Sequence, residues 1–380
     1  MTRFLITSLL VFAACTQVHG VDAYGNRDVL YGPEGDVVAV GFVAQETREG
    51  VEYASALGLP TKLLRWSQVD RIEYAGMADK SFYAVGMSDM SAGQFETAAQ
   101  RFAAMAMGED KKEWEKAYGW FYEGVAWERA KAFDKAAAAF GNVASNFPKH
   151  RLAFDAFYRQ GINQARSKDS AGAKATAAAL EAIGEEERNR QAKNRAQAIT
   201  VAVAASEGKM EDATSLARRV TFSARDGLTN LHWNQYWAGV LMERGEYAEA
   251  VSVYERLLAT SGDVDPAETA ALSLGHGIAL AKDGKPDRAL SALMRLDALP
   301  YGSPEQRLEA RFWIGKLMWE LAQERRNHER EVVAEFATAS ITESRRLLEA
   351  VVASTLSNPV KEEAKLLLES IPAPDQAAAE

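Results

Sequence analysis

The stretch that decides the fold runs from Trp120 to Pro148 and contains the pattern Trp120-x3-Gly124-x2-Trp127-x5-Phe133-x2-Ala136-x3-Phe140-x7-Pro148. Apolar or small residues recur in it at i, i+3, i+4 and i+7, a spacing that predicts two amphipathic helices. Gly124 and Ala136 are small, so the two helices can approach each other closely. Phe140 follows Ala136 by one helical turn and can fill the gap against the next unit. We therefore expect a pair of antiparallel helices whose apolar face needs a neighbour to cover it.

Similar pairs recur from about residue 79 onward. A second clear copy is Gly245-Glu246-Tyr247-x2-Ala250-x3-Tyr254, and weaker copies fill the intervals. The small residue of the second helix returns at nearly constant intervals, as Ala98, Ala136, Ala173, Ala213, Ala250 and Ala289. Evenly recurring glycines and the lack of sustained heptads argue against a coiled coil.

These motifs resemble the tetratricopeptide repeat (TPR), a helix pair with a minimal period of about 34 residues. The family has aromatic, alanine and proline positions at the places that are held here by Phe133, Ala136, Phe140 and Pro148. The resemblance implies a mostly α protein, an α-solenoid of about seven TPR-like helix pairs over residues 79–372. The seventh pair is expected to have an expanded middle, and the tail at 373–380 is expected to be disordered.

Residues 24–78 differ in residue pattern from the helical part of the chain. Stretches at 36–44, 50–53 and 69–74 are rich in β-branched residues or alternate with period two, which predicts short antiparallel strands. We expect a small antiparallel β module, SH3-like or Sm-like, that is marginal in size and packs against the first helices. It could cover the end of the array as a structural cap, or it could bind a ligand in a groove.

The segment 1–23 has the features of a signal peptide. Arg3 precedes a nine-residue, mostly apolar stretch at 4–12, which is too short for a membrane-spanning helix of about 20 residues. Two cleavage sites compete. Cleavage after Ala14 would make Cys15 the first residue, as in the lipobox that this segment resembles, whereas cleavage after Ala23 would discard it. The expected location is the periplasm, with a lipid anchor in the outer membrane if Cys15 is lipidated.

Composition narrows the functional classes. The 380-residue chain has a formal net charge of −9, which argues against a nucleic-acid partner, because such binding needs a basic surface. One cysteine excludes a disulfide framework and a thiolate-only metal site. The five histidines lack metal-ligand spacing, and no nucleophile elbow, Walker or dinucleotide motif is present. We expect no cofactor, no metal and no enzyme activity; a carboxylate pair in a cleft is the remaining enzymatic alternative.

The resemblance implies that the first helix of each pair lines a concave groove that binds a protein or peptide. Aromatic side chains suit such a groove because they bury a large area with few rotamers to freeze. In the register of the repeat, the candidate groove residues are Tyr118, Phe121, Tyr158, Gln235, Met242, Phe312, Lys316 and Trp319. Some of these rings could instead be ordinary packing between repeats. Phe121 and Val125 stand where chaperone-binding members of the family carry the Lys and Asn of a carboxylate clamp, so that specificity is not expected.

The leading expectation is an exported TPR scaffold that binds other proteins through this groove in a bacterial envelope complex. One alternative is a module that binds cell-wall glycan or another polymer through the β segment. The other is an enzyme with an unrecognised site.

Overall fold

A computed structural model describes residues 26–75, 82–109, 111–220, 222, 227–260, 266–298, 302–326, 331–356 and 358–372. The expected signal peptide with Cys15 and the expected disordered tail lie outside these ranges. The chain divides into two compact units, Met1–Asn230 and Leu231–Glu380, and each is described by itself.

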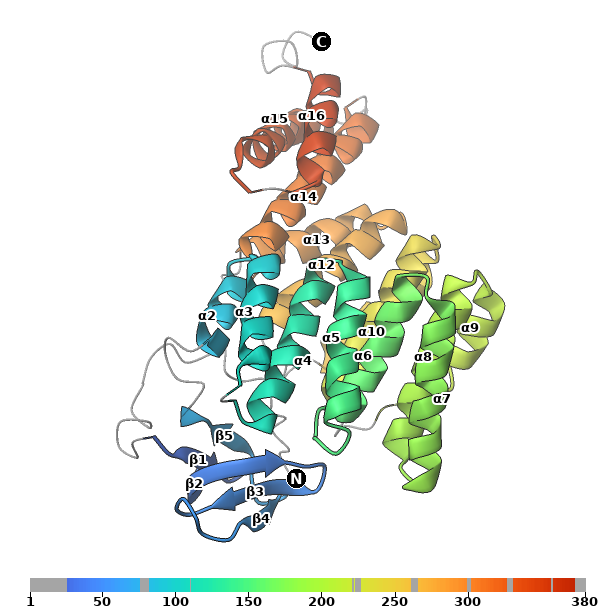
Figure 1. The fold of residues 1–380 in the computed structure, drawn as a ribbon. Coiled ribbons are helices and arrows are strands. Elements are labelled where there is room, and N and C mark those ends of the chain that lie inside the picture. The colour runs from blue at the N-terminus through green and yellow to red at the C-terminus, as the bar shows by residue number, and fades with distance from the viewer. Residues whose placement is uncertain are drawn as a thin grey trace. The chain divides into compact units, whose positions relative to one another are not determined.

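The first unit begins with a five-stranded antiparallel sheet (Figure 1). Its strands are β1 (Asp28–Tyr31), β2 (Val37–Glu46), β3 (Gly50–Ala54), β4 (Lys62–Arg65) and β5 (Arg71–Glu73). Consecutive strands pair from β1 to β4, and β5 returns to the free edge of β1, which gives the order β4-β3-β2-β1-β5. The sequence predicted β2, β3 and β5, whereas β1 and β4 were not anticipated. Both are four-residue strands, too short for a clear alternation.

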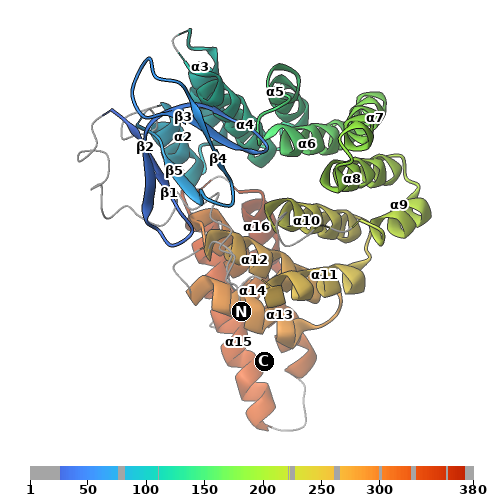
Figure 2. The same cartoon turned by 90° about the horizontal axis from the view of Figure 1, so that it is seen from below.

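The rest of the first unit is helical. Its helices are α2 (Phe82–Ser91), α3 (Phe95–Met107), α4 (Glu113–Arg129), α5 (Phe133–Asn146), α6 (Ala153–Arg166), α7 (Ser170–Glu186), α8 (Arg190–Ser206) and α9 (Met210–Ala217). Within this unit the first helices α4, α6 and α8 form one layer and the second helices α3, α5 and α7 form another (Figure 2). The boundary between the two units falls inside α10 (Gly227–Glu243).

The second unit continues with further helix pairs. After α10 come α11 (Tyr247–Thr260), α12 (Pro266–Lys282), α13 (Pro286–Ala298), α14 (Pro304–Arg325), α15 (Glu331–Ala353) and α16 (Val360–Ser370). α14 and α15 have 22 and 23 residues, so the last pair is expanded, as expected. The Ser303 side chain and the Gln306 side chain cap the start of α14 reciprocally.

Six turns inside the helix pairs share one backbone geometry. Each contains a residue with a left-handed φ between 60° and 80°, five positions before a buried alanine: Gly93, Lys131, Lys168, Gly208, Gly245 and Gly284. In each turn the N–H of this residue bonds to the carbonyl three positions earlier, and the next N–H bonds to the carbonyl five positions earlier. This is the Schellman arrangement, which ends one helix and reverses the chain into the next.

The packing repeats with the turns. The six alanines predicted from the spacing, Ala98 to Ala289, are all fully buried. A Cβ added to Gly124 would lie 2.8 Å from ring atoms of Phe140, and one added to Gly86 would lie 2.8 Å from Phe102. In these two pairs the glycine of the first helix therefore receives the aromatic ring of the second helix, whereas Gly277 of α12 meets Leu293 of α13. Phe140 also shares a core cluster with Ala156 of the following pair. These turns and contacts make the helical part an array of TPR-like pairs, which confirms the expected fold class.

Candidate functional site: the junction of the β module and the array

The β module is joined to the array by a buried polar cluster centred on Glu46. Glu46 lies at the end of β2, and its side chain is fully buried. Its carboxylate accepts hydrogen bonds from the hydroxyls of Tyr74 and Tyr118 and forms an ion pair with Arg151. Arg151 also donates to the Tyr118 hydroxyl and lies over the Trp66 ring, 4.7 Å from its centroid. Four sequence-distant segments thus meet at one carboxylate.

Burial controls protonation in this cluster. Burial raises the pKa of Tyr74 and of Tyr118 well above their ordinary value, so both hydroxyls stay protonated and can donate. Burial also lowers the pKa of His150 to about 4. The neutral ring accepts the Leu152 N–H at Nδ1, 3.2 Å away, while Nε2 has no hydrogen-bond partner among the described residues. These features define a structural cluster that is sensitive to acid.

A second set of contacts lies between β1, β2 and the start of α4. Asp28 accepts the backbone N–H groups of Val43 at 2.8 Å and Ala75 at 3.1 Å. The Val43 carbonyl accepts the indole N–H of Trp114 at 3.3 Å, and the Trp114 ring stacks on Tyr74 at 4.0 Å between centroids. Because these side chains belong to one hydrophobic core that extends from the sheet into α2, α3 and α4, the β module packs on the first helices, as expected.

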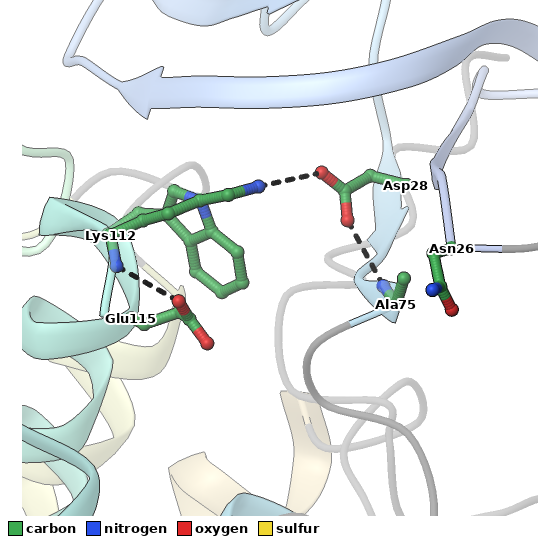
Figure 3. A pocket seen from close by; sticks show the side chains of 6 residues that line it. Asn26, Asp28, Ala75, Lys112 and Glu115 are labelled. Atoms are coloured by element: carbon green, nitrogen blue, oxygen red, sulfur yellow. Dashed lines mark hydrogen bonds and ion pairs between the residues drawn. The ribbon is translucent and has the colours of Figure 1, made fainter. Parts of the chain in front are cut away.

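A cavity of about 240 Å³ opens beside these contacts and is lined by Asn26, Asp28, Ala75, Lys112, Trp114 and Glu115 (Figure 3). Its charged groups already have protein partners: Lys112 Nζ lies 3.8 Å from Asp28, and Glu115 accepts the Lys112 N–H at 2.9 Å and the Lys111 ammonium at 3.2 Å. Ligand pockets usually enclose more space than this cavity does. We assign it no function.

The β2–β3 loop docks on the turns between helix pairs. The Arg48 N–H donates to the Lys149 carbonyl at 3.2 Å, and its guanidinium donates to the Pro148 carbonyl at 3.1 Å. The same guanidinium pairs with Glu187 and lies 4.5 Å from the centroid of Phe154. One loop of the module therefore contacts two successive inter-pair connections, which favours the structural-cap interpretation over a free ligand-binding face.

The structure buries most of the predicted groove residues. Tyr118, Phe121, Tyr158, Phe312 and Trp319 are all less than a tenth exposed. Tyr118, Phe121 and the pair Phe312 and Trp319 belong to three hydrophobic clusters, and Tyr158 meets Phe222 at 6.3 Å. These rings pack inside the protein and offer little surface to a ligand. Gln235, Met242 and Lys316 are partly exposed, and their role in binding stays a prediction.

An ion pair with a buried arginine connects the first helices of two successive pairs, and no sequence motif indicates it. Arg195 on α8 donates to Asp155 on α6 at 2.8 Å, and both bond to the Thr229 hydroxyl. Burial raises the pKa of Asp155, but Arg195 and Thr229 outweigh it, so the pKa lies below its ordinary value. Asp155 and Arg195 are far apart in the sequence, so they can be recognised as a pair only when the repeat register places them on neighbouring helices.

Comparison with known proteins adds little beyond the architecture. No known family model and no curated protein sequence matches the chain. Among solved structures, a tetratricopeptide repeat protein from Parabacteroides merdae superposes with a TM-score of 0.34 and 14% sequence identity, over 76% of this chain and 96% of that one. Assignment of the TPR-like pairs therefore rests on the turns and contacts described above.

Proposed function

We propose that the chain is an exported scaffold that binds other proteins through its helical array, in a bacterial envelope complex. The observation that carries the proposal is the helix pair repeated with one turn geometry and one fully buried alanine on the second helix. Stacked pairs of this kind present long surfaces assembled from many helices, which suit extended or helical polypeptides. In the described ranges, no three His, Cys, Asp or Glu side chains are grouped as metal ligands. The absence of enzyme activity remains an expectation.

Export is supported by the sequence of segment 1–23, and the periplasm is the proposed compartment. Cys15 is the residue proposed to carry a lipid anchor. The mass of the mature N-terminus distinguishes a lipid-modified chain that begins at Cys15 from an unmodified chain that begins at Tyr24. None of the helices in the described ranges has the length and hydropathy that a membrane crossing requires.

The partly exposed groove residues are the proposed points of contact. Met242 lies near the end of α10, and Lys316 lies on α14, with its ammonium 4.9 Å from the centroid of Trp313. Their side chains can reach a partner without disturbing a core. The buried rings are unsuitable for testing, because truncation of Phe121 or Trp319 would destabilise the fold by about 3–5 kcal/mol.

The test starts with crosslinking and mass spectrometry in intact cells, which reports neighbours and compartment together. Capture of the crosslinked partner is then measured with Met242→Asp and with Lys316→Glu. We expect at least one of the two to reduce capture by about tenfold or more. Met294→Asp is the matched control, because Met294 is 53% exposed on α13, a second helix. If capture is unchanged in both variants, or lost equally in the control, the proposed surface is wrong.

A further inference from the structure

The loop between β3 and β4 projects an apolar tip. The stretch 53–61 carries no charge. Leu57 is 78% exposed and Leu59 is 53% exposed. Gly58 between them has a φ of +83°, and a Cβ added there would meet nothing within 4 Å. Two exposed leucines two positions apart give this open turn a small apolar surface.

Two cations follow the tip on the adjoining strand. Lys62 and Arg65 lie on β4 and are exposed, and neither forms an ion pair with another described residue. Figure 1 shows β4 at the lower margin of the first unit, with the helices of this unit above it. Apolar side chains at a protruding tip with cations behind them match a lipid interface, where leucines reach the acyl boundary and cations lie at the phosphates.

The size of the tip favours a bilayer over a protein partner. A stable protein interface buries about 800 Å² on each partner, whereas this tip offers two leucine side chains. A bilayer needs no complementary shape, so a small apolar tip can insert and act together with another membrane attachment. The overall charge of −9 opposes adsorption on anionic lipid, so the contact is weak by itself and a second attachment nearby strengthens it.

β1 begins close to the residue at which β3 ends, beside the middle of β2. Asp28, the first residue of β1, pairs with Gly41, and the neighbouring Phe42 pairs with Ala54, the last residue before the loop. Cys15 precedes Asn26 by eleven positions, which span at most about 40 Å when fully extended. A lipid on Cys15 would therefore keep the region around Asp28 and Ala54, from which the loop starts, within about 40 Å of a membrane.

We infer that the β3–β4 loop contacts the lipid bilayer through Leu57 and Leu59, with Lys62 and Arg65 at the headgroups. The inference rests on the proposed export and deepens it: the β module covers the end of the array and also orients the anchored chain at the membrane. Two attachments, a lipid and an apolar tip, give stable binding where either alone is weak.

Vesicle flotation tests the contact of the loop with a bilayer in a chain that has no lipid anchor. The chain is produced from position 15 onward with Cys15→Ser, which retains every described residue, and is mixed with vesicles of phosphatidylethanolamine and phosphatidylglycerol. We expect measurable flotation that falls about tenfold in the Leu57→Asp, Leu59→Asp double variant. Lys62→Glu with Arg65→Glu should lower flotation on these vesicles and leave it unchanged on phosphatidylcholine. Met107→Asp is the matched control, since Met107 is 71% exposed at the end of α3.

Three results would overturn the inference. They are an absence of flotation by the parent chain, equal flotation by the leucine variant, and leucine-dependent self-association in sedimentation, which would make a second copy the occupant. Partner capture is measured on the leucine variant and on the two groove variants, Met242→Asp and Lys316→Glu. If flotation depends on the leucines while Met242→Asp and Lys316→Glu retain full capture, the proposed protein-binding surface fails and the membrane contact stands.

Discussion

Replacing Lys131 or Lys168 by glycine should stabilise the chain by about 0.5–1 kcal/mol at each site, because each lysine side chain strains its turn. The two lysines hold left-handed φ angles of 60° and 67°, at the turn position where four other pairs carry glycine. A side chain in this conformation costs roughly 1–2 kcal/mol. Glycine removes that cost but loses more conformational freedom on folding, by about 0.4–1 kcal/mol. The difference between the two free energies is the expected gain.

Alanine separates backbone strain from charge. Lys131→Ala and Lys168→Ala remove the same charge but keep a Cβ in the left-handed conformation. Because both lysines are exposed, these variants should stay within about 0.5 kcal/mol of the parent. The reciprocal variant is Gly208→Ala, which places a Cβ where nothing lies within 4 Å. Its expected loss of about 1 kcal/mol would therefore come from the backbone alone.

The assay must resolve individual helix pairs, because repeat arrays can unfold in parts. Native-state hydrogen exchange reports the local free energy of opening for amides of α4 and α5 around Lys131, and of α6 and α7 around Lys168. Slower exchange in the glycine variants than in the alanine variants is expected. If the glycine variants exchange as fast as their alanine counterparts, the two lysines do not occupy the same strained turn as the four glycines.

Three further predictions concern the packing and the junction. Gly124→Ala should destabilise the chain by about 1–2 kcal/mol, because its Cβ would meet the Phe140 ring at 2.8 Å; Gly239→Ala on α10, where nothing lies within 4 Å, should be stabilising instead, and thermal unfolding distinguishes them. For His150 the folded pKa of about 4 lies below the ordinary 6.5, so the unfolded chain takes up the proton first and stability falls as the pH drops from about 6.5 to 4. The loss between pH 7 and pH 5 should be about 2 kcal/mol, and urea unfolding should show it reduced in His150→Gln; an equal loss in that variant would contradict the assignment. Glu46→Gln should cost about 3 kcal/mol, since it leaves Arg151 without its counter-charge. Glu46→Leu combined with Arg151→Met should cost less than the sum of the single changes, which a double-mutant cycle measures.

The sequence predicted the features that each helix pair carries within itself. The six alanines recur at nearly constant spacing, and all six are buried, because a small residue is needed wherever two helices approach closely. Turn glycines such as Gly245 were visible for the same local reason. The equivalent turns at Lys131 and Lys168 were not, since a lysine gives no indication of a left-handed φ and only its distance from the buried alanine reveals the position.

Long-range features could not be predicted from one sequence. Glu46 and Arg151 lie far apart in the chain, and nothing local indicates that they pair. The burial of the rings assigned to the inner face could not be predicted for a related reason. The register placed Tyr118 and Phe121 on the first helix correctly, but it did not include the β module, whose residues share a core with Tyr118. The β module covers Tyr118, whereas Phe121 packs against Phe140 inside the array.

The β module and the first helices bury each other's apolar surfaces. Partner binding by the array and membrane contact by the module therefore cannot be separated by deleting the module. An array of stacked pairs leaves an apolar face at its end that requires a cap, and here Trp114, Tyr118 and Tyr83 bury that face against residues of the sheet such as Val43 and Leu30. The sheet is equally dependent, because about 50 residues seldom bury enough apolar surface to fold alone. Deleting the module would therefore expose a core and leave the partly buried Arg151 without Glu46, and loss of partner capture in such a deletion would report unfolding. Substitutions at exposed positions, Met242 and Lys316 on the array and Leu57 and Leu59 on the module, separate the two surfaces while each unit keeps its core.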